Sequence, residues 1–396
     1  MSRLIRLDCV SLLLATLLLG ACAATPPPPL PQTSANSVLD GPVRALMARE
    51  SVQGLALAVI RNGQLRQLAV YGYQDAATGI PLRESSVMAA ASWTKTAVAY
   101  RVLQLVDQRR IDLDAGPASI LRNPLPTYQR PGADYSDLKQ DARWRAFSPR
   151  VLLTHGSGLA NFRRFEPDGR LRIHFDPGSR YAYSGEGYQV MQFMLEQGLG
   201  LRLARTMEQE VFTPLGMLET SLVWQSRYAI RAVTGYDATG QAVAFDQRQQ
   251  ADAAGSMATT ISDQARFWAA LVRGEGLSQW ARSELVRPQR VIATPHQFPT
   301  LTGDLSAPYA QIGLAAGLGV ITYQGPAGQV WFKGGHDVGT GNLAICVEPT
   351  GDCLVMMSND VRAERIYPEI SRMVLGDIGF PWRWEYSWLP EDAVPR

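Results

Sequence analysis

A serine and a lysine three residues apart are the first side chains in this 396-residue chain that could do chemistry together. Ser92 and Lys95 form an S-x-x-K motif at the start of a predicted helix, residues 94–109. Positions i and i+3 share one face of a helix, so the hydroxyl and the amine can meet. A serine needs such an adjacent base to become a nucleophile. The motif therefore predicts a serine nucleophile activated by Lys95, and its structural alternative is an N-capping serine beside a solvated lysine.

The scarcity of lysine favours the catalytic interpretation. Among 38 lysines and arginines, only Lys95, Lys139 and Lys333 are lysines. Arginine stays protonated in proteins, whereas lysine can lose its proton. A compositional bias of the genome would explain the arginines equally well. Lys139 lies in a charged stretch and is expected to be solvated surface.

Two later segments carry further groups that could take part in catalysis. A loop rich in glycine and tyrosine, residues 177–188, precedes a predicted helix and contains Tyr183. This tyrosine could relay protons if nearby cations lowered its pKa. Lys333 begins a K-G-G-H segment at the end of a predicted strand, where adjacent glycines let a substrate approach the backbone. A packed tyrosine and a β-bulge or turn are the structural alternatives for these two segments.

The elements that must position these residues follow a strand–helix–strand order. Two β-like runs, residues 55–61 and 64–73, flank Asn62-Gly63, which is a strong hairpin signal. Further strands are predicted at 317–323, 329–333, 342–347 and 353–358, and helices at 94–109, 150–155, 188–197, 203–212, 262–273, 278–286 and 361–375. Ser148 is expected to cap the second of these helices, with Pro149 at its first position.

This order predicts an α/β (α+β) fold. We expect one antiparallel sheet built from both termini, with flanking helices and a helical inserted domain. In a single domain at residues 40–396, residues 40–90 and 310–396 would form the α/β part. Residues 91–309 would form the mainly helical part, and the active site would lie in the crevice between the two.

The N-terminus has the pattern of an export signal. Residues 1–21 contain two arginines followed by an apolar run too short to span a membrane. The run ends in L-G-A-C, which resembles a bacterial lipobox and predicts lipidation at Cys22; plain signal cleavage is the alternative. A proline-rich linker at 22–39 would hold the domain away from a membrane. We expect a periplasmic protein with a lipid anchor.

Cysteine usage and charge narrow the remaining possibilities. Cys346 and Cys353 flank a predicted hairpin turn; an oxidising periplasm permits a disulfide there, and two buried thiols fit equally well. The net charge of +2 argues against a nucleic-acid partner, and 46% hydrophobic residues argue against disorder. The four histidines have no zinc-binding spacing, so we expect no metal and no other cofactor.

Together these segments resemble the serine β-lactamase and penicillin-binding-protein superfamily. The chain is similar to its class C β-lactamase branch, with the related DD-peptidases and family VIII esterases. The similarity runs from about residue 40 to about residue 379. It includes L-L-T-H-G-S-G-L at 152–159, close to the family's L-L-T-H-T-S-G-L, and A-A-G-S at 253–256.

The resemblance implies a catalytic group and an oxyanion hole. The nucleophile, its activating partner, the tyrosine of the Y-x-N motif and the lysine of the K-T-G motif would be Ser92, Lys95, Tyr183 and Lys333. The backbone N–H groups of Ser92 and His336 would hold the oxyanion, and Gly335 and Gly185 would line the substrate site. Lys333 would lower the pKa of Lys95, and both cations would favour Tyr183 as a phenolate. His155 would be structural.

Two positions depart from the family pattern. Gly185 replaces the asparagine of Y-x-N, which in the family helps to bind the amide side chain of β-lactams. Gly334 replaces the threonine of K-T-G and so removes a hydroxyl near the substrate carboxylate. Glu186 or Asp337 would be the polar side chains available to replace these contacts.

The resemblance leads to several candidate functions for a monomer acting on a small molecule. The first is a class C-like β-lactamase that cleaves a β-lactam amide through an acyl-enzyme on Ser92. A DD-carboxypeptidase acting on a D-Ala-D-Ala peptide, or a carboxylesterase acting on an ester, would use the same chemistry. A penicillin-binding sensor or scaffold that is acylated without turnover is the alternative of another class.

Overall fold

The computed structural model describes residues 38–130 and 132–389. The predicted signal peptide, Cys22 and nearly all of the proline-rich linker lie outside the described residues. No helix in the described part of the chain is long and apolar enough to cross a membrane.

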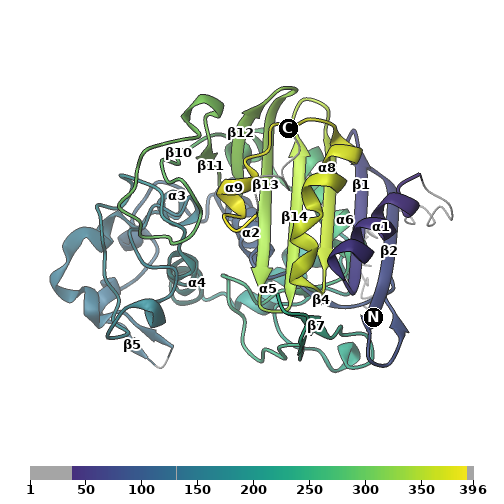
Figure 1. The fold of residues 1–396 in the computed structure, drawn as a ribbon. Coiled ribbons are helices and arrows are strands. Elements are labelled where there is room, and N and C mark those ends of the chain that lie inside the picture. The colour runs from purple at the N-terminus through teal and green to yellow at the C-terminus, as the bar shows by residue number, and fades with distance from the viewer. Residues whose placement is uncertain (1–37, 131, 390–396) are drawn as a thin grey trace, which may run out of the picture.

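A nine-stranded antiparallel sheet forms the body of the molecule (Figure 1). Its order is β10-β11-β12-β13-β14-β15-β1-β2-β3, so the N-terminal strands join the C-terminal ones through β1 and β15. The strands are β1 (Gly54–Arg61), β2 (Gln64–Asp75), β3 (Ile80–Pro81), β10 (Arg290–Val291), β11 (Ala315–Ala316), β12 (Ile321–Gly325), β13 (Gly328–Asp337), β14 (Thr340–Val347) and β15 (Asp352–Ser358). The expectation of one sheet built from both termini is confirmed.

The predicted hairpin at the start of the sheet is present. Asn62 and Gly63 have φ angles of 49° and 68°, the left-handed values that a two-residue turn between β1 and β2 requires. The strand predicted at 317–323 is wrong in its first half. A turn at residues 317–320 separates β11 from β12. Gly319 in this turn packs directly against Ala99 of helix α2 (Trp93–Asp107).

Both faces of the sheet are buried. Along β1, Leu55, Leu57 and Val59 belong to one hydrophobic core, while the alternating Ala56, Ala58 and Ile60 belong to the other. Helices α1 (Asp40–Glu50) and α8 (Tyr367–Leu375) cover the first face, and α2 (Trp93–Asp107) and α6 (Ile261–Arg273) cover the second (Figure 1). The result is a helix–sheet–helix arrangement that holds α2 against β13.

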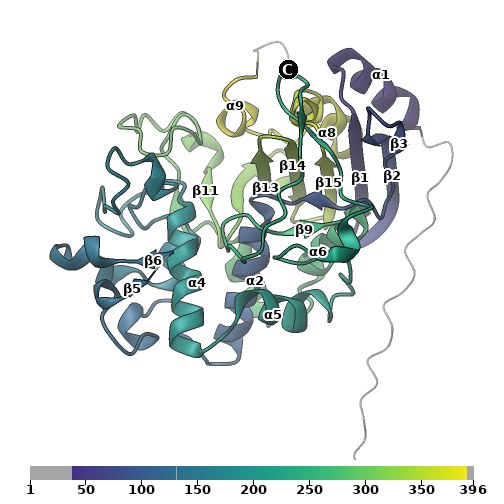
Figure 2. The ribbon, with the colours of Figure 1, turned by 90° about the horizontal axis from the view of Figure 1, so that it is seen from below.

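The helical part lies beside this body, and Figure 2 shows α2 between the sheet and α4. Its helices are α3 (Pro149–Leu153), α4 (Gly185–Leu199), α5 (Leu203–Met207) and α7 (Gln279–Val286). Ser148 caps α3 as expected, because its hydroxyl accepts a hydrogen bond from the backbone N–H of Val151. The short pairs β4 (Met88–Ala89) with β9 (Ala258–Thr259), β5 (Gln129–Arg130) with β6 (Ala133–Asp134), and β7 (Gly235–Tyr236) with β8 (Ala242–Val243) connect these helices.

Several element boundaries differ from the expectation. The helix expected at 203–212 is α-helical only to Met207, and Glu208–Phe212 form a π-helical turn. The helix expected at 361–375 is divided at Ile366 into a 3₁₀ segment, Val361–Arg365, and α8. Pro368 explains this division, because its missing N–H is tolerated only in the first turn of a helix. Helices α1 and α9 (Trp382–Glu385) were not predicted.

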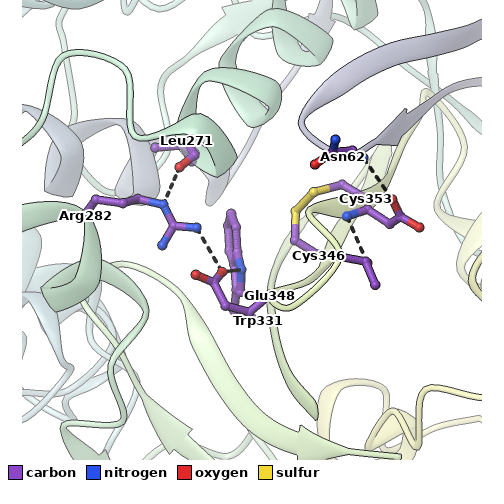
Figure 3. The surroundings of a disulfide bond; sticks show 9 residues. Asn62, Leu271, Arg282, Trp331, Cys346, Glu348 and Cys353 are labelled. Carbon is purple, nitrogen blue, oxygen red and sulfur yellow. Dashed lines mark hydrogen bonds and ion pairs between the residues drawn. A yellow bond between two sulfur atoms is a disulfide. The ribbon is translucent and has the colours of Figure 1, made fainter. Parts of the chain in front are cut away.

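A disulfide joins β14 to β15. Cys346 and Cys353 lie opposite each other in register, and their sulfur atoms are bonded (Figure 3). Beside them, the Glu348 carboxylate accepts hydrogen bonds from Trp331 Nε1 at 2.6 Å and from Arg282 at 2.9 Å. These contacts tie the end of the β14–β15 hairpin to β13 and α7.

Candidate active site

The predicted nucleophile lies at the N-terminus of α2. Ser92 is the residue before the helix, and the preceding Ala91 has a φ of 46°. A non-glycine residue in this region is strained by about 1 kcal/mol or more. Thr94 holds the bend, since its hydroxyl donates to the Ala91 carbonyl at 2.7 Å and accepts from the Met257 N–H at 3.0 Å. The bend leaves Ser92 partly accessible while the helix behind it is buried.

The structure brings three of the four predicted catalytic side chains into direct contact. Lys95 Nζ lies 3.2 Å from Ser92 Oγ, as the i, i+3 spacing requires. The Tyr183 hydroxyl donates a hydrogen bond of 2.7 Å to the same Ser92 oxygen. Ser92 therefore has an amine on one side and a phenol on the other.

Lys95 is placed to act as a neutral amine. Its side chain is buried, and Nζ donates to the Ala254 carbonyl at 2.6 Å. Burial, and then the positive charge of Lys333, lower the pKa of Lys95 well below its usual value. A free amine 3.2 Å from a serine hydroxyl can accept its proton.

The expected phenolate form of Tyr183 is wrong for this state of the site. Burial raises the pKa of Tyr183, although its hydrogen bond to Ser92 opposes the shift. Both lysine amines lie over its ring, with Lys95 Nζ at 4.9 Å and Lys333 Nζ at 5.1 Å from the centroid. The cost of burying an anion exceeds any stabilisation that these amines give a phenolate, so Tyr183 is a hydrogen-bond donor at neutral pH.

The His155 ring packs against the ring of Tyr183. The two rings stack with centroids 4.3 Å apart, and His155 Nδ1 accepts a hydrogen bond from the Ser184 N–H at 3.1 Å. Burial and the charges of Lys95 and Lys333 lower the pKa of His155. A neutral ring with its Nδ1 already occupied fits the structural role expected for it.

The K-G-G-H segment approaches the nucleophile along β13. The Lys333 side chain is buried, its Nζ donates to the Gly334 carbonyl at 3.0 Å, and its own carbonyl accepts from Trp93 Nε1 at 2.7 Å. A side chain at Gly335 would meet the Ala90 carbonyl at 2.7 Å. Gly335 is therefore needed for β13 to lie directly against the segment that ends in Ser92. Strand β12 pairs with β13 only as far as Phe332, which leaves the following residues paired with β14 alone.

The structure explains the departure at Gly185. An added Cβ would lie 2.7 Å from Phe162 Cε1 and 2.8 Å from the Asn161 carbonyl. Where the resemblance implies a polar asparagine, an aromatic ring fills the space. Glu186 does not replace the lost contact, because it accepts from the Arg163 N–H at 2.8 Å and forms an ion pair with the Arg163 guanidinium at 3.2 Å.

The departure at Gly334 has a different explanation. An added Cβ would lie 1.8 Å from Glu385 Oε1, so the carboxylate of Glu385 occupies the place of the missing side chain. Glu385 ends helix α9, which lies beside β13 in Figure 1. Its other oxygen, Oε2, accepts a hydrogen bond from Gln297 Nε2. Glu385 was not predicted, because it lies far along the chain from Lys333, in a segment that is notable in the sequence for its aromatic residues alone.

A second acidic residue lies at the far end of the segment. His336 is exposed, and its Nδ1 is 2.9 Å from Glu364 Oε1. Partial loss of hydration opposes a charge on the ring, but the hydrogen bond and the charge of Glu364 outweigh it and raise the pKa of His336. Asp337 is exposed, and its side chain accepts from the Val338 N–H. Among the described residues, no cluster of three or more histidine, cysteine, aspartate and glutamate side chains could hold a metal ion.

Comparison with known proteins places residues 39–372 in one family. A family model described as Beta-lactamase matches residues 39–372. Curated relatives include a D-aminopeptidase of Gluconobacter oxydans (24% identity over 52% of this chain and 39% of the relative), esterase EstB of Burkholderia gladioli (30%, 46% and 49%) and a beta-lactamase of Pseudomonas fluorescens (25%, 53% and 57%). In each case the matched region covers less than two thirds of the relative.

Two solved structures share the fold over most of the chain. The octameric penicillin-binding protein homologue from Pyrococcus abyssi has a TM-score of 0.67 at 16% identity, covering 88% of this chain and 78% of its own. The D-alanine carboxypeptidase AmpC from Burkholderia cenocepacia has a TM-score of 0.63 at 16% identity, covering 80% and 91%.

Proposed function

Because this chain belongs to the beta-lactamase family of serine hydrolases, we propose that it cleaves small esters or amides through an acyl-enzyme on Ser92. One observation carries the proposal: the Ser92 hydroxyl lies between the Lys95 amine and the Tyr183 phenol. A solvated lysine beside an N-capping serine would explain neither the burial of Lys95 nor its lowered pKa.

The acylation step follows from the protonation states. The neutral amine of Lys95 takes the proton of Ser92 as Oγ attacks the substrate carbonyl carbon. The carbonyl oxygen becomes an oxyanion, for which the N–H groups of Ser92 and His336 are the proposed donors. When the carbon–oxygen or carbon–nitrogen bond breaks, the leaving group takes a proton, for which the Tyr183 hydroxyl is the nearest donor to Ser92 Oγ. Water then attacks the ester on Ser92 and gives a proton to the Tyr183 phenolate. The serine oxygen leaves with the proton held by Lys95, which releases the acid and restores Ser92, Lys95 and Tyr183.

The surroundings of this group favour a carboxylesterase over a β-lactamase. Phe162 fills the space at Gly185 where the resemblance implies a β-lactam contact, and Glu385 fills the space at Gly334. Phe298, 46% exposed, adds an aromatic edge 5.4 Å from the Tyr183 ring. Two aromatic side chains near the nucleophile and the loss of the two polar contacts suit a simple acyl group. β-Lactam hydrolysis remains the second candidate, supported by the shared Ser92, Lys95, Tyr183 and Lys333.

A comparison of substrates tests the proposal. The chain is assayed with a nitrophenyl ester, a chromogenic cephalosporin, a carbapenem and a D-Ala-D-Ala peptide, each against Ser92→Ala. We expect turnover of the ester that depends on Ser92 and exceeds turnover of the other three. Faster hydrolysis of the cephalosporin would support the β-lactamase instead, and a lasting adduct without turnover would support the sensor. Equal activity in Ser92→Ala would overturn the mechanism.

We also propose that the protein is exported and anchored through Cys22. The support is the L-G-A-C sequence after the apolar run and the proline-rich linker that follows it. Fractionation of cells producing the full chain tests this proposal. A protein with Cys22→Ala should leave the membrane fraction, and retention there would contradict lipid anchoring.

A further inference from the structure

The segment that carries Glu385 is fixed firmly against the active site. After α8 the chain continues to Leu389 with four buried aromatic residues, Phe380, Trp382, Trp384 and Tyr386. The Trp384 ring lies 6.1 Å from that of Tyr181 and 6.3 Å from that of Phe332, and the Trp384 carbonyl accepts from the Gln297 N–H at 2.9 Å. This segment lies beyond residues 39–372, the part that matches the family. The segment packs onto β13 of the shared fold through Trp384 and Phe332.

The Glu385 carboxylate lies against the K-G-G-H segment of β13. Its Oε2 is held by Gln297, while Oε1 lies over Gly334, next to Lys333 on the same strand. The side chain keeps partial access to solvent. The pKa of Glu385 is influenced by the charges of Lys333 and His336 on β13 and of Glu364 in the Val361–Arg365 segment.

Lys333 and Glu385 affect each other's ionisation. Burial raises the pKa of Glu385 to about 7, and Lys333 opposes this shift. Burial lowers the pKa of Lys333 to about 8, and Glu385 opposes that shift. Lys333, which the resemblance assigns to the catalytic group, thus already has an anion of the protein near it.

We propose that Glu385 occupies the subsite which receives the substrate carboxylate in relatives with K-T-G. The enzyme therefore selects acyl donors whose leaving group is uncharged and donates a hydrogen bond, an inference that rests on the proposed function. The resemblance puts the hydroxyl of K-T-G near that carboxylate, and Glu385 Oε1 takes the place of this side chain. A substrate carboxylate there would meet a carboxylate of the protein with only one cation between them. Like charges brought together in a desolvated site repel each other, which we expect to lower kcat/KM roughly a hundredfold.

Three substrates with one acyl group isolate this effect. Phenylacetyl esters of glycolic acid, methyl glycolate and glycolamide all give the same phenylacetyl-Ser92, so deacylation is common and kcat/KM differs through acylation alone. The leaving alcohol carries a carboxylate, a neutral ester or a primary amide. We expect the acid to react about a hundredfold more slowly than the amide, with the methyl ester between them.

Variants assign the discrimination to Glu385. In Glu385→Gln the amide-to-acid ratio should fall about tenfold or more. Gly334→Ala, whose Cβ would displace Oε1, should lower the ratio in the same direction. Glu385→Ala/Gly334→Thr, which restores K-T-G, should lower it furthest. Glu369→Gln, a carboxylate on α8 paired with Arg49, should keep the wild-type ratio.

The outcomes separate this inference from the proposed function. Melting temperatures identify any variant that fails to fold, and the remaining variants carry the test. A phenylacetyl adduct on Ser92 with an unchanged ratio in both Glu385→Gln and Gly334→Ala would overturn the specificity role and leave the acyl-enzyme intact. A wild-type enzyme that takes the acid as readily as the amide would also overturn it. Absence of any adduct from the three esters would overturn the proposed function and this inference with it.

Discussion

The Tyr183 hydroxyl donates a 2.7 Å hydrogen bond to the oxygen of Ser92. Since burial raises the pKa of this phenol, the tyrosine enters the reaction protonated. The nearest group able to take the serine proton is then the Lys95 amine, 3.2 Å away. This division gives the two partners of Ser92 different roles, each of which a conservative substitution can remove.

Replacing Tyr183 with phenylalanine should remove the proton donor and keep the packing. The ring still stacks on His155, so the fold should be unchanged, while kcat should fall about a hundredfold because the leaving group loses its nearest proton source. Tyr181→Phe is the matched control, since the buried Tyr181 hydroxyl has no hydrogen-bond partner. Steady-state kinetics of both variants on the phenylacetyl ester of methyl glycolate, whose alkoxide leaving group needs a proton, measures the difference. Equal losses in the two variants would mean that the Tyr183 hydroxyl has no chemical role.

Lys95→Arg should abolish acylation although it preserves a positive charge. Arginine cannot lose its proton in this site, so Ser92 would have no base, and we expect at least about a thousandfold loss of kcat/KM. Lys139→Arg, at a solvated surface position, should behave as wild type. An active Lys95→Arg enzyme would refute the role of Lys95 as a base. Compositional bias would then be sufficient to explain why lysine is scarce in this chain.

Selectivity against acidic leaving groups should rise with pH. Glu385, with a pKa of about 7, gains its charge as pH rises through neutrality, and Lys333, with a pKa of about 8, loses its charge just above. Both changes disfavour binding of a substrate carboxylate, so the amide-to-acid ratio of kcat/KM should increase from pH 6 to pH 9. The lower pH lies about one unit below the pKa of Glu385, and the higher pH lies about one unit above the pKa of Lys333. The other titratable groups that influence Glu385 or respond to it are His336, Glu364, Tyr181, Tyr183 and Tyr386.

Two variants locate this pH dependence. Glu385→Gln should lose the step near pH 7, whereas Glu369→Gln should keep it. A profile in Glu385→Gln that still rises through pH 7 would assign the step to another of these groups.

Removing the disulfide should affect stability and spare catalysis. Cys346 and Cys353 close a loop with a sequence separation of 7, for which the lost chain entropy corresponds to about 2 kcal/mol of unfolding free energy. The double variant Cys346→Ala/Cys353→Ala, unfolded in urea, measures this cost. Its kcat at low temperature should match wild type, because the bond joins β14 to β15 and touches none of the catalytic side chains. A folded variant with lost activity would show that the bond positions the site.

Local patterns account for the parts of the fold that were predicted. Asn62-Gly63 determines its hairpin because only left-handed residues suit the turn, and Ser92 with Lys95 share a helix face whatever surrounds them. The sheet from both termini followed from the order of strands and helices. These features depend on neighbours within a few residues, which a single sequence displays directly.

The errors concern long-range packing. Glu385 reaches Gly334 through a tail held by aromatic contacts, and no local pattern shows that a carboxylate will lie in the place of a side chain on another strand. Tyr183 was expected to be a phenolate because of the neighbouring lysines, but burial of the side chain has the larger effect on its pKa. Gly185 and Gly334 were recognised as departures, but what replaced the missing side chains required the structure.

The acyl-enzyme itself is the most direct test of the account. The full chain is mixed with a nitrophenyl ester, quenched in acid within the first turnovers, and its intact mass is measured, followed by peptide mapping. We predict a mass increase of one acyl group, located on the peptide that contains Ser92 and absent from Ser92→Ala. Turnover of the ester by Ser92→Ala at the wild-type rate, or an acyl group on another residue, would contradict it.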